Sequence, residues 1–204
     1  MTSNRHTSVT GRDDTAERAI PPEVLDATRA AVLAVGVRRT TLTDVARRAG
    51  VSRMTLYRLV PDVTTLILAV MTREFAAVFS DAEQQVRRRR TGRARAVAAM
   101  VEVVRRLPEA QLFQRVVDVD PEVLLPYLTD RLGATQRLAI GHVRRMLSVG
   151  ITDGSIRRAD LDTLAMTAVL AATPFVVSAR LLDDASRTAA LDELTRMLDC
   201  WLAP

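Results

Sequence analysis

Residues 49–62 read AGVSRMTLYRLVPD, a short amphipathic segment bounded by Gly50 on one side and Pro61 on the other. Ser52 fits the N-cap position of a helix, because its hydroxyl can accept a hydrogen bond from a backbone N–H in the first turn. Pro61 ends this helix, since the residue before a proline avoids the helical conformation. The stretch therefore predicts a short helix over about residues 53–60.

Two further helices are predicted before this segment. A proline pair opens one at about 22–35, and Gly36 ends it as a C-terminal cap. The next runs over about 42–49 after Thr41, a natural N-cap, with Asp44 three residues on as the acid of a capping box. Three helices, the last two joined by the tight AGVS turn, form the pattern of a helix-turn-helix.

In a helix-turn-helix the second helix crosses the DNA backbone and the third helix enters the major groove. Val51 and Leu56 can pack the third helix against the second, which leaves its polar and cationic side chains to face outward. Arginine can read guanine through its two major-groove acceptors, and Arg53 and Arg58 are the candidates. Taken alone, two arginines on one helix are more commonly a solvated face.

The stretch TTLTDVARRAGVSRMTLYRLVPDVTTL, residues 40–66, resembles the DNA-binding segment of TetR-family transcriptional repressors. The residues that match the family pattern are Thr41, Val45, Ala46, Ala49, Gly50, Val51, Ser52, Thr55, Leu56, Tyr57 and Leu66. The resemblance implies that hydroxyl and phenol groups contact phosphates while arginines read bases. The predicted DNA-binding residues are Thr41, Thr43, Ser52, Arg53, Met54, Thr55, Tyr57 and Arg58.

Several positions depart from the family pattern. Met54 stands where a small residue is usual, Leu59 replaces a His or Tyr, Val60 replaces a Phe and Val63 replaces a Lys. Two polar phosphate contacts are therefore missing, and DNA binding is expected to depend less on salt than in a typical relative. A helical interaction protein whose helix-turn-helix no longer binds DNA is the alternative that these departures favour.

The composition is that of a soluble globular protein, since 48% of its 204 residues are hydrophobic and 26% are charged. No run of 18 apolar residues marks a membrane span, and the N-terminus lacks the apolar core of a secretory signal. We therefore expect a cytoplasmic protein without membrane association. The polar residues 1–20 lack periodicity and are expected to form a flexible N-terminal arm.

Residue types that carry chemistry are sparse. Cys200 is the single cysteine, so no internal disulfide or cysteine zinc site can form, and His6 lies far from His142 in sequence. The sequence contains no nucleophile elbow, glycine-rich phosphate loop or paired metal-ligand motif, and Asp118 with Asp120 is weak evidence for catalysis. We predict a protein that is not an enzyme and uses no metal or cofactor.

The rest of the chain shows repeated apolar spacings typical of helices, without the alternation typical of strands. One long pattern starts at Pro121 and continues past Tyr127, and GITDG at 150–154 predicts the turn that follows it. Two more helices come after this turn, the first capped by Asp160. We predict an all-α fold.

A second basic zone, VRRRRTGRAR at residues 86–95, sits at the junction of two predicted helices. Residues 87–106 hold 8 Arg against 1 acid, a net charge of +7. Such a zone attracts polyanions, but the resemblance places this junction far from DNA. We expect a solvated junction that pairs with nearby acids.

The resemblance implies an N-terminal three-helix DNA-binding domain at residues 21–62 and a C-terminal helical domain at residues 63–204 that binds a ligand and forms dimers. The predicted pocket residues are Phe113, Val117, Tyr127, His142, Met146, Met166 and Phe175. The predicted dimer-interface residues are Leu164, Ala168, Ala172, Leu191, Leu194, Leu198 and Trp201. The expected function is a repressor, or alternatively an activator, that binds a palindromic double-stranded DNA operator as a homodimer and is released by a small apolar or amphipathic effector.

Overall fold

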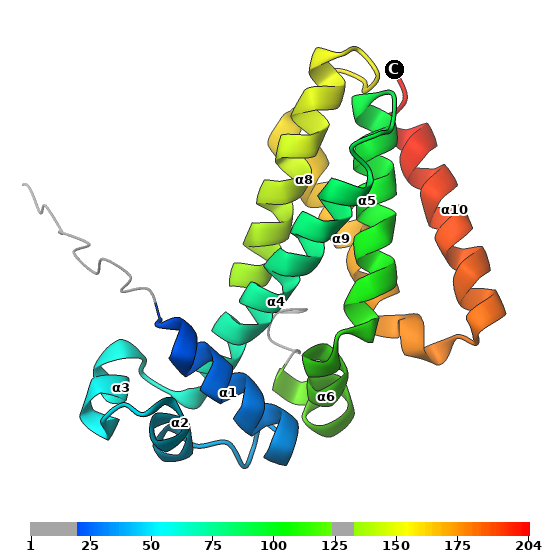
Figure 1. Ribbon diagram of the computed structural model, residues 1–204. Helices are drawn as coiled ribbons and strands as arrows, with labels where there is room; N and C mark the ends of the chain where they lie inside the picture. The colour runs from blue at the N-terminus through cyan, green and yellow to red at the C-terminus, as the bar shows by residue number, and fades with distance from the viewer. Residues whose placement is uncertain (1–19, 124–132) are drawn as a thin grey trace, which may run out of the picture.

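The computed structural model describes residues 20–123 and 133–204, and within these ranges the chain is helical with no strand, which confirms the predicted all-α fold. Apart from Ile20, the predicted N-terminal arm lies outside the described residues, as does Tyr127. Figure 1 shows the first three helices at one end of the molecule and a bundle of longer helices at the other. The helices are α1 (Pro22–Val35), α2 (Leu42–Ala49), α3 (Arg53–Leu59), α4 (Val63–Gln85), α5 (Gly92–Arg106), η1 (Leu107–Glu109), α6 (Gln111–Val119), η2 (Pro121–Val123), α8 (Ala134–Thr152), α9 (Leu161–Ser178), η3 (Ala179–Leu181) and α10 (Asp184–Leu202).

The first three helices begin and end close to where the sequence predicts. The Thr41 hydroxyl accepts a hydrogen bond from the backbone N–H of Asp44 at 3.1 Å, so the predicted N-cap is confirmed. The predicted capping box is wrong, because the Asp44 carboxylate accepts hydrogen bonds from Arg47 and Arg48, each at 2.6 Å. Helix α3 ends at Leu59, one residue early, since the residue that precedes the proline is already extended.

One apolar cluster holds the three short helices together. Its buried members are Val24, Ala27, Ala31, Leu42, Val45, Ala46, Leu56, Val60 and Leu66. Leu66 belongs to the first turn of α4, so the long helix also forms part of this cluster. Two ion pairs fasten α1 to α4 further along, one between Arg29 and Glu74 and one between Arg73 and Asp26 at 2.7 Å.

A second cluster forms the core of the bundle from α5, α8, α9 and α10. Leu164, Ala168, Leu194 and Leu198 are buried in it, with exposed fractions of 2% or less. Three further predicted interface residues, Ala172, Leu191 and Trp201, are partly buried against the same cluster. The four buried side chains cannot reach a second copy, so their assignment to a dimer interface is wrong, whereas for Ala172, Leu191 and Trp201 it stays a prediction.

Two of these helices, α4 and α9, are long and apolar enough to cross a membrane by length and composition alone. The core helices of soluble bundles have the same properties. In this structure α4 carries buried side chains in three apolar clusters, and α9 packs along α8.

Helix α8 includes the first three residues of the turn predicted at 150–154, and Gly150 is buried inside the helix bundle. A Cβ on Gly150 would lie 2.3 Å from the Cδ1 atom of the buried Ile156, and one on Gly92 would lie 2.4 Å from the Gly150 Cα. The start of α5 therefore touches α8 backbone to backbone, and only glycine permits this approach.

We expect Gly150→Ala to lower the free energy of unfolding by about 1–3 kcal/mol, because its methyl group has to displace buried atoms. Gly141 lies in the same helix, but a Cβ there would come no closer than 3.9 Å to the Arg145 guanidinium. Gly141→Ala is the matched control and should raise stability by about 0.4–1 kcal/mol. Urea denaturation measures both, and equal effects would contradict the backbone contact.

A buried carboxylate joins the bundle to the three short helices α1, α2 and α3, which we call the three-helix head. Asp120 follows α6, is fully buried, and accepts a hydrogen bond from the backbone N–H of Val37 at 2.8 Å. Its other oxygen lies 3.2 Å from the Arg38 guanidinium, which also pairs with Glu122. The turn between α1 and α2 is therefore anchored to the C-terminal end of α6.

Asp120→Ala is expected to destabilise the protein by about 1–3 kcal/mol, because the buried N–H of Val37 loses its acceptor. Asp120→Asn keeps an acceptor oxygen and should recover part of that loss. Asp118, two residues earlier, is exposed and pairs with the exposed Arg180 at 3.2 Å. Asp118→Ala should therefore cost less than about 0.5 kcal/mol. Similar unfolding midpoints for the two alanine variants would contradict the anchor.

Candidate DNA-binding surface and ligand cavity

The outer face of α3 is polar and exposed while its inner face is apolar and buried. Leu56 has no exposed surface and sits in the cluster beneath the helix-turn-helix. The side chains of Met54 and Tyr57 are 72% and 55% exposed, and the two arginines Arg53 and Arg58 are exposed as well. The structure thus places the predicted base-reading side chains on one accessible helix face.

The hydroxyl groups of Thr41 and Ser52 cap the first turns of α2 and α3 by accepting backbone hydrogen bonds. A hydroxyl that accepts such a bond can still donate its own hydrogen to another acceptor. Ser52 Oγ accepts from the backbone N–H of Thr55 at 3.0 Å and lies 2.8 Å from the Thr55 hydroxyl. Since these two hydroxyls share one hydrogen bond, one hydroxyl hydrogen remains for a phosphate oxygen. Thr41 is likewise exposed and retains its own hydrogen, while Thr43 is half-buried in the first turn of α2.

Charge on this surface is concentrated on α3. Hydrogen bonds from Arg48 and then from Arg47 hold the pKa of Asp44 below its ordinary value, so this carboxylate stays ionised and offsets charge on α2. Arg53 and Arg58 have no carboxylate partner within residues 20–123 and 133–204. An arginine without an internal partner is free to pair with a DNA phosphate or base.

The departures from the family pattern have a packing explanation. Val60 is only 2% exposed, and Leu59 and Val63 are partly buried against the same cluster as Leu56. These side chains support the helix-turn-helix from below, where a polar residue would lose hydration. Met54 is the one departure that lies on the exposed face of α3.

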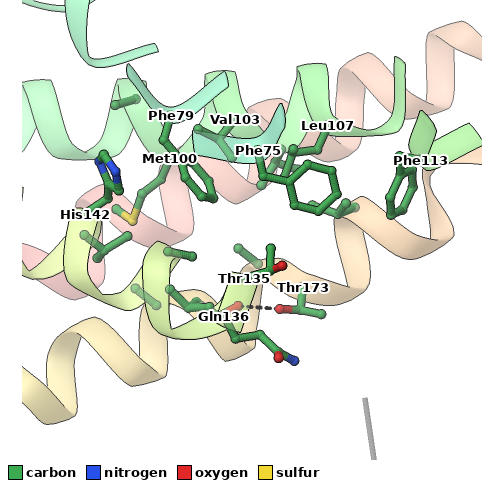
Figure 2. A pocket seen from close by; sticks show the side chains of 18 of the residues that line it. Phe75, Phe79, Met100, Val103, Leu107, Phe113, Thr135, Gln136, His142 and Thr173 are labelled. Atoms are coloured by element: carbon green, nitrogen blue, oxygen red, sulfur yellow. Dashed lines mark hydrogen bonds between the residues drawn. The ribbon is translucent and has the colours of Figure 1, made fainter. Parts of the chain in front are cut away.

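A separate cavity of about 170 Å³ lies in the bundle among α4, α5, α6, α8 and α9. Figure 2 shows His142 at one end and Phe113 at the other, with Phe75 between them. Apolar side chains make up most of the wall, and the polar lining side chains are Glu83, Thr135, Gln136, His142 and Thr173. A largely apolar cavity with a few polar groups is typical of a small-molecule site.

The polar end of the cavity is organised around His142. Its Nδ1 atom lies 2.6 Å from a carboxylate oxygen of Glu83 and 2.8 Å from the Arg145 guanidinium. One nitrogen cannot donate to Glu83 and accept from Arg145 at once, and donation to the carboxylate is favourable because an ionised carboxylate only accepts. The ring also packs at 5.2 Å from that of Phe79, which fixes its position.

The structure brings only some of the predicted pocket residues together. Phe113, His142 and Met146 line the cavity. Val117 is buried in the cluster under α1 and α4, and Phe175 lines a separate groove between α9 and α10. Met166 is 41% exposed on the outside of α9, so its placement in the pocket is wrong.

Helices α4, α5 and η1 supply cavity residues that the sequence interpretation assigned only to a packed helix face. These residues include Met71, Phe75, Phe79, Met100, Val103 and Leu107. Their helical spacing was visible in the sequence, but the same spacing describes a packed core and a cavity wall. Bulky aromatic residues one turn apart, Phe75 and Phe79, were the available signal.

Comparison with known proteins identifies the family of the chain. Residues 24–66 match the family model described as bacterial regulatory proteins, tetR family. The chain is 35% identical over 180 residues to the HTH-type transcriptional regulator Mb2274c of Mycobacterium bovis, covering 88% of this chain and 92% of that protein. It is 34% identical over the same length to Rv2250c of Mycobacterium tuberculosis, with the same coverage.

Solved structures show the same fold. The transcriptional repressor QsdR of R. erythropolis aligns with a TM-score of 0.69 at 18% identity, over 86% of this chain and 92% of that chain. RolR in complex with resorcinol aligns with a TM-score of 0.61 at 18% identity, over 86% and 85% of the two chains. Together with the helix-turn-helix geometry, these matches show that the chain belongs to the TetR family of DNA-binding transcriptional regulators and is not an enzyme.

Proposed function

We propose that this regulator is a cytoplasmic repressor that binds a palindromic operator as a homodimer and leaves it when a small apolar or amphipathic molecule enters the cavity. The observation that carries the proposal is the position of α6. Phe113 of α6 lines the cavity, and Asp120 directly after the same helix anchors the turn between α1 and α2. QsdR is named a repressor and RolR was solved with a small phenol, which supports both halves of the proposal.

Coupling requires that the ligand binds one arrangement of the chain better than the other. A molecule that fills the cavity presses on α6 through Phe113 and on α4 through Phe75, which lie with their ring centroids 5.9 Å apart. Displacement of either helix shifts the three-helix head. Asp120, directly after α6, accepts a hydrogen bond from Val37, and Leu66 of α4 is buried in the core of the head. In a dimer this displacement changes the distance between the two copies of α3. The two half-sites of a palindromic operator require a fixed distance between these helices, about one helical turn of DNA.

The surface proposed for dimerisation differs from the stripe that the sequence predicted. Met166 and Leu170 are exposed one turn apart on α9, and Met197 is exposed on α10. An apolar groove between the two helices is lined by Phe175, Leu181, Leu182 and Leu191, among others. Exposed apolar groups on a soluble chain mark surfaces of association, and a symmetric dimer would cover each patch with its copy.

We expect Leu170→Glu to yield a folded monomer, because the charge would be buried without a partner in the dimer interface. Sedimentation velocity at micromolar concentration measures the mass, and circular dichroism checks that helicity is kept. Met54→Glu adds the same charge to an exposed apolar residue of α3 and should leave the dimer intact. A wild-type monomer, or a dimeric Leu170→Glu variant, would rule out this interface.

The DNA-binding proposal is tested with DNA that flanks the protein's own gene. Footprinting should reveal a protected palindrome, and fluorescence anisotropy should show that Arg53→Gln and Arg58→Gln each weaken binding by about tenfold or more, the cost of about 1–3 kcal/mol for a lost bidentate base contact. Tyr57→Phe removes a neutral phosphate contact, so it should weaken binding and leave its salt dependence unchanged.

The matched control replaces two arginines that are exposed at the opposite end of the molecule. Arg88→Gln with Arg89→Gln lowers the net charge by two without touching the head and should change operator affinity by less than about threefold. If the control weakens binding as strongly as the α3 variants, general charge attraction and not α3 is responsible. Absence of any footprint would instead favour a helical interaction protein, and footprints that raise transcription would identify an activator.

A further inference from the structure

The arginines of this chain fall into paired and unpaired groups. Within the described residues, arginines on most helices have a carboxylate partner within 4.0 Å. The side chains of Arg87, Arg88, Arg89 and Arg90 have none there, although a junction paired with nearby acids was expected. The unpaired run lies at the turn between α4 and α5, away from the DNA-reading helix (Figure 1).

A groove opens beside this turn. It has a volume of about 310 Å³ and is framed by Arg87, Arg95 and Arg145 from α4–α5 and α8. We call it the arginine groove. Its remaining lining residues are Ser80, Glu83, Gln84, Val86, Met146 and Val149.

The arginine groove adjoins the apolar cavity, because Glu83 and Met146 line both. Glu83 lies within hydrogen-bond distance of His142, and His142 lies at the opposite end of the cavity from Phe113 (Figure 2). Glu83 is turned toward His142 at 2.6 Å and lies 3.9 Å from Arg145, so its charge is engaged at the boundary. The apolar cavity therefore adjoins a groove that is lined by three arginines and by one carboxylate, that of Glu83. Asp153 lies outside the groove lining, although its carboxylate interacts electrostatically with Arg95.

We propose that the arginine groove binds the anionic end, a phosphate or carboxylate, of an amphipathic effector whose apolar part fills the cavity. The inference rests on the proposed function, since it uses the same cavity as the ligand site. The cavity of about 170 Å³ is close to the ~150 Å³ that accepts one benzene ring, so the buried part has about six to eight carbon atoms.

The chemistry of the cavity and of the arginine groove together favours an amphipathic ligand with an anionic end. Guanidinium groups bind phosphate and carboxylate through paired hydrogen bonds, which Arg87 and Arg95 are free to make without giving up an ion pair at 4.0 Å or less. A neutral molecule would fill the cavity and leave the arginines unused. A cationic molecule would meet repulsion from the guanidinium groups at the mouth.

Isothermal titration calorimetry with three probes of equal tail length tests the inference on the full-length protein. The probes are n-octyl phosphate, n-octanol and n-octylamine, with inorganic phosphate as a head-only probe. We expect n-octyl phosphate to bind at least about tenfold more tightly than n-octanol, because the alcohol cannot form the charge-assisted hydrogen bonds with the guanidinium groups. n-Octylamine should bind most weakly, and only the n-octyl phosphate affinity should fall with added salt.

Variants of the same arginine run separate the groove from general charge. Arg87→Gln with Arg95→Gln should remove the advantage of n-octyl phosphate and leave n-octanol binding unchanged. Arg88→Gln with Arg89→Gln removes equal charge outside the groove and should keep that advantage. Equal affinities for n-octyl phosphate and n-octanol, or equal losses in both double variants, would overturn the inference while the cavity remains a ligand site. Binding of none of the tailed probes would overturn the cavity as the ligand site, and the inference with it.

Discussion

Helix α4 is the constraint on which the arrangement of this protein depends. It contributes Leu66 to the cluster of the DNA-binding head, Phe75 to the next cluster and Ala82 to a third, so one continuous helix belongs to three packed regions. Packed regions resist small deformations because interior atoms are close-packed. The proposed function uses this continuity, because a ligand that displaces α4 at the cavity would also act on the head.

The contacts that hold the head differ in strength. The ion pairs of α1 with α4 are partly exposed, and exposed ion pairs contribute about 0–1 kcal/mol each. The contact of Asp120 with Val37 is buried, and a buried acceptor is costly to lose. The head is thus held to α6 by a buried polar contact and to α4 by buried apolar packing through Leu66, and the exposed ion pairs add little to either.

The sequence was most informative where local chemistry decides the structure. Thr41, Ser52 and Pro61 mark helix ends through hydrogen bonds and backbone geometry that lie within a few residues, and the helix bounds follow closely. Leu198 and Met166 show the opposite case. Both fit an apolar face of a helix, and only the packing of α9 and α10 on their neighbours decides that the first is buried and the second exposed. Asp120 was not predictable as an anchor, because its partner Val37 lies far away in the chain.

Whether an arginine has a carboxylate partner says more about its role than the number of arginines in the chain does. A chain whose cations are all arginine carries them on most of its surface, and composition alone cannot separate solvated groups from binding groups. Inside the structure, Arg47, Arg48 and Arg105 are held by carboxylates one turn away and have little charge left to offer. Arg53 and Arg87 have no such partner within residues 20–123 and 133–204, and they belong to the two surfaces proposed to bind anions, the exposed face of α3 and the arginine groove. Lack of a partner alone does not mark a binding arginine, since Arg88 and Arg89 are also unpaired but line no groove, so the shape of the surrounding surface has to be considered with the pairing.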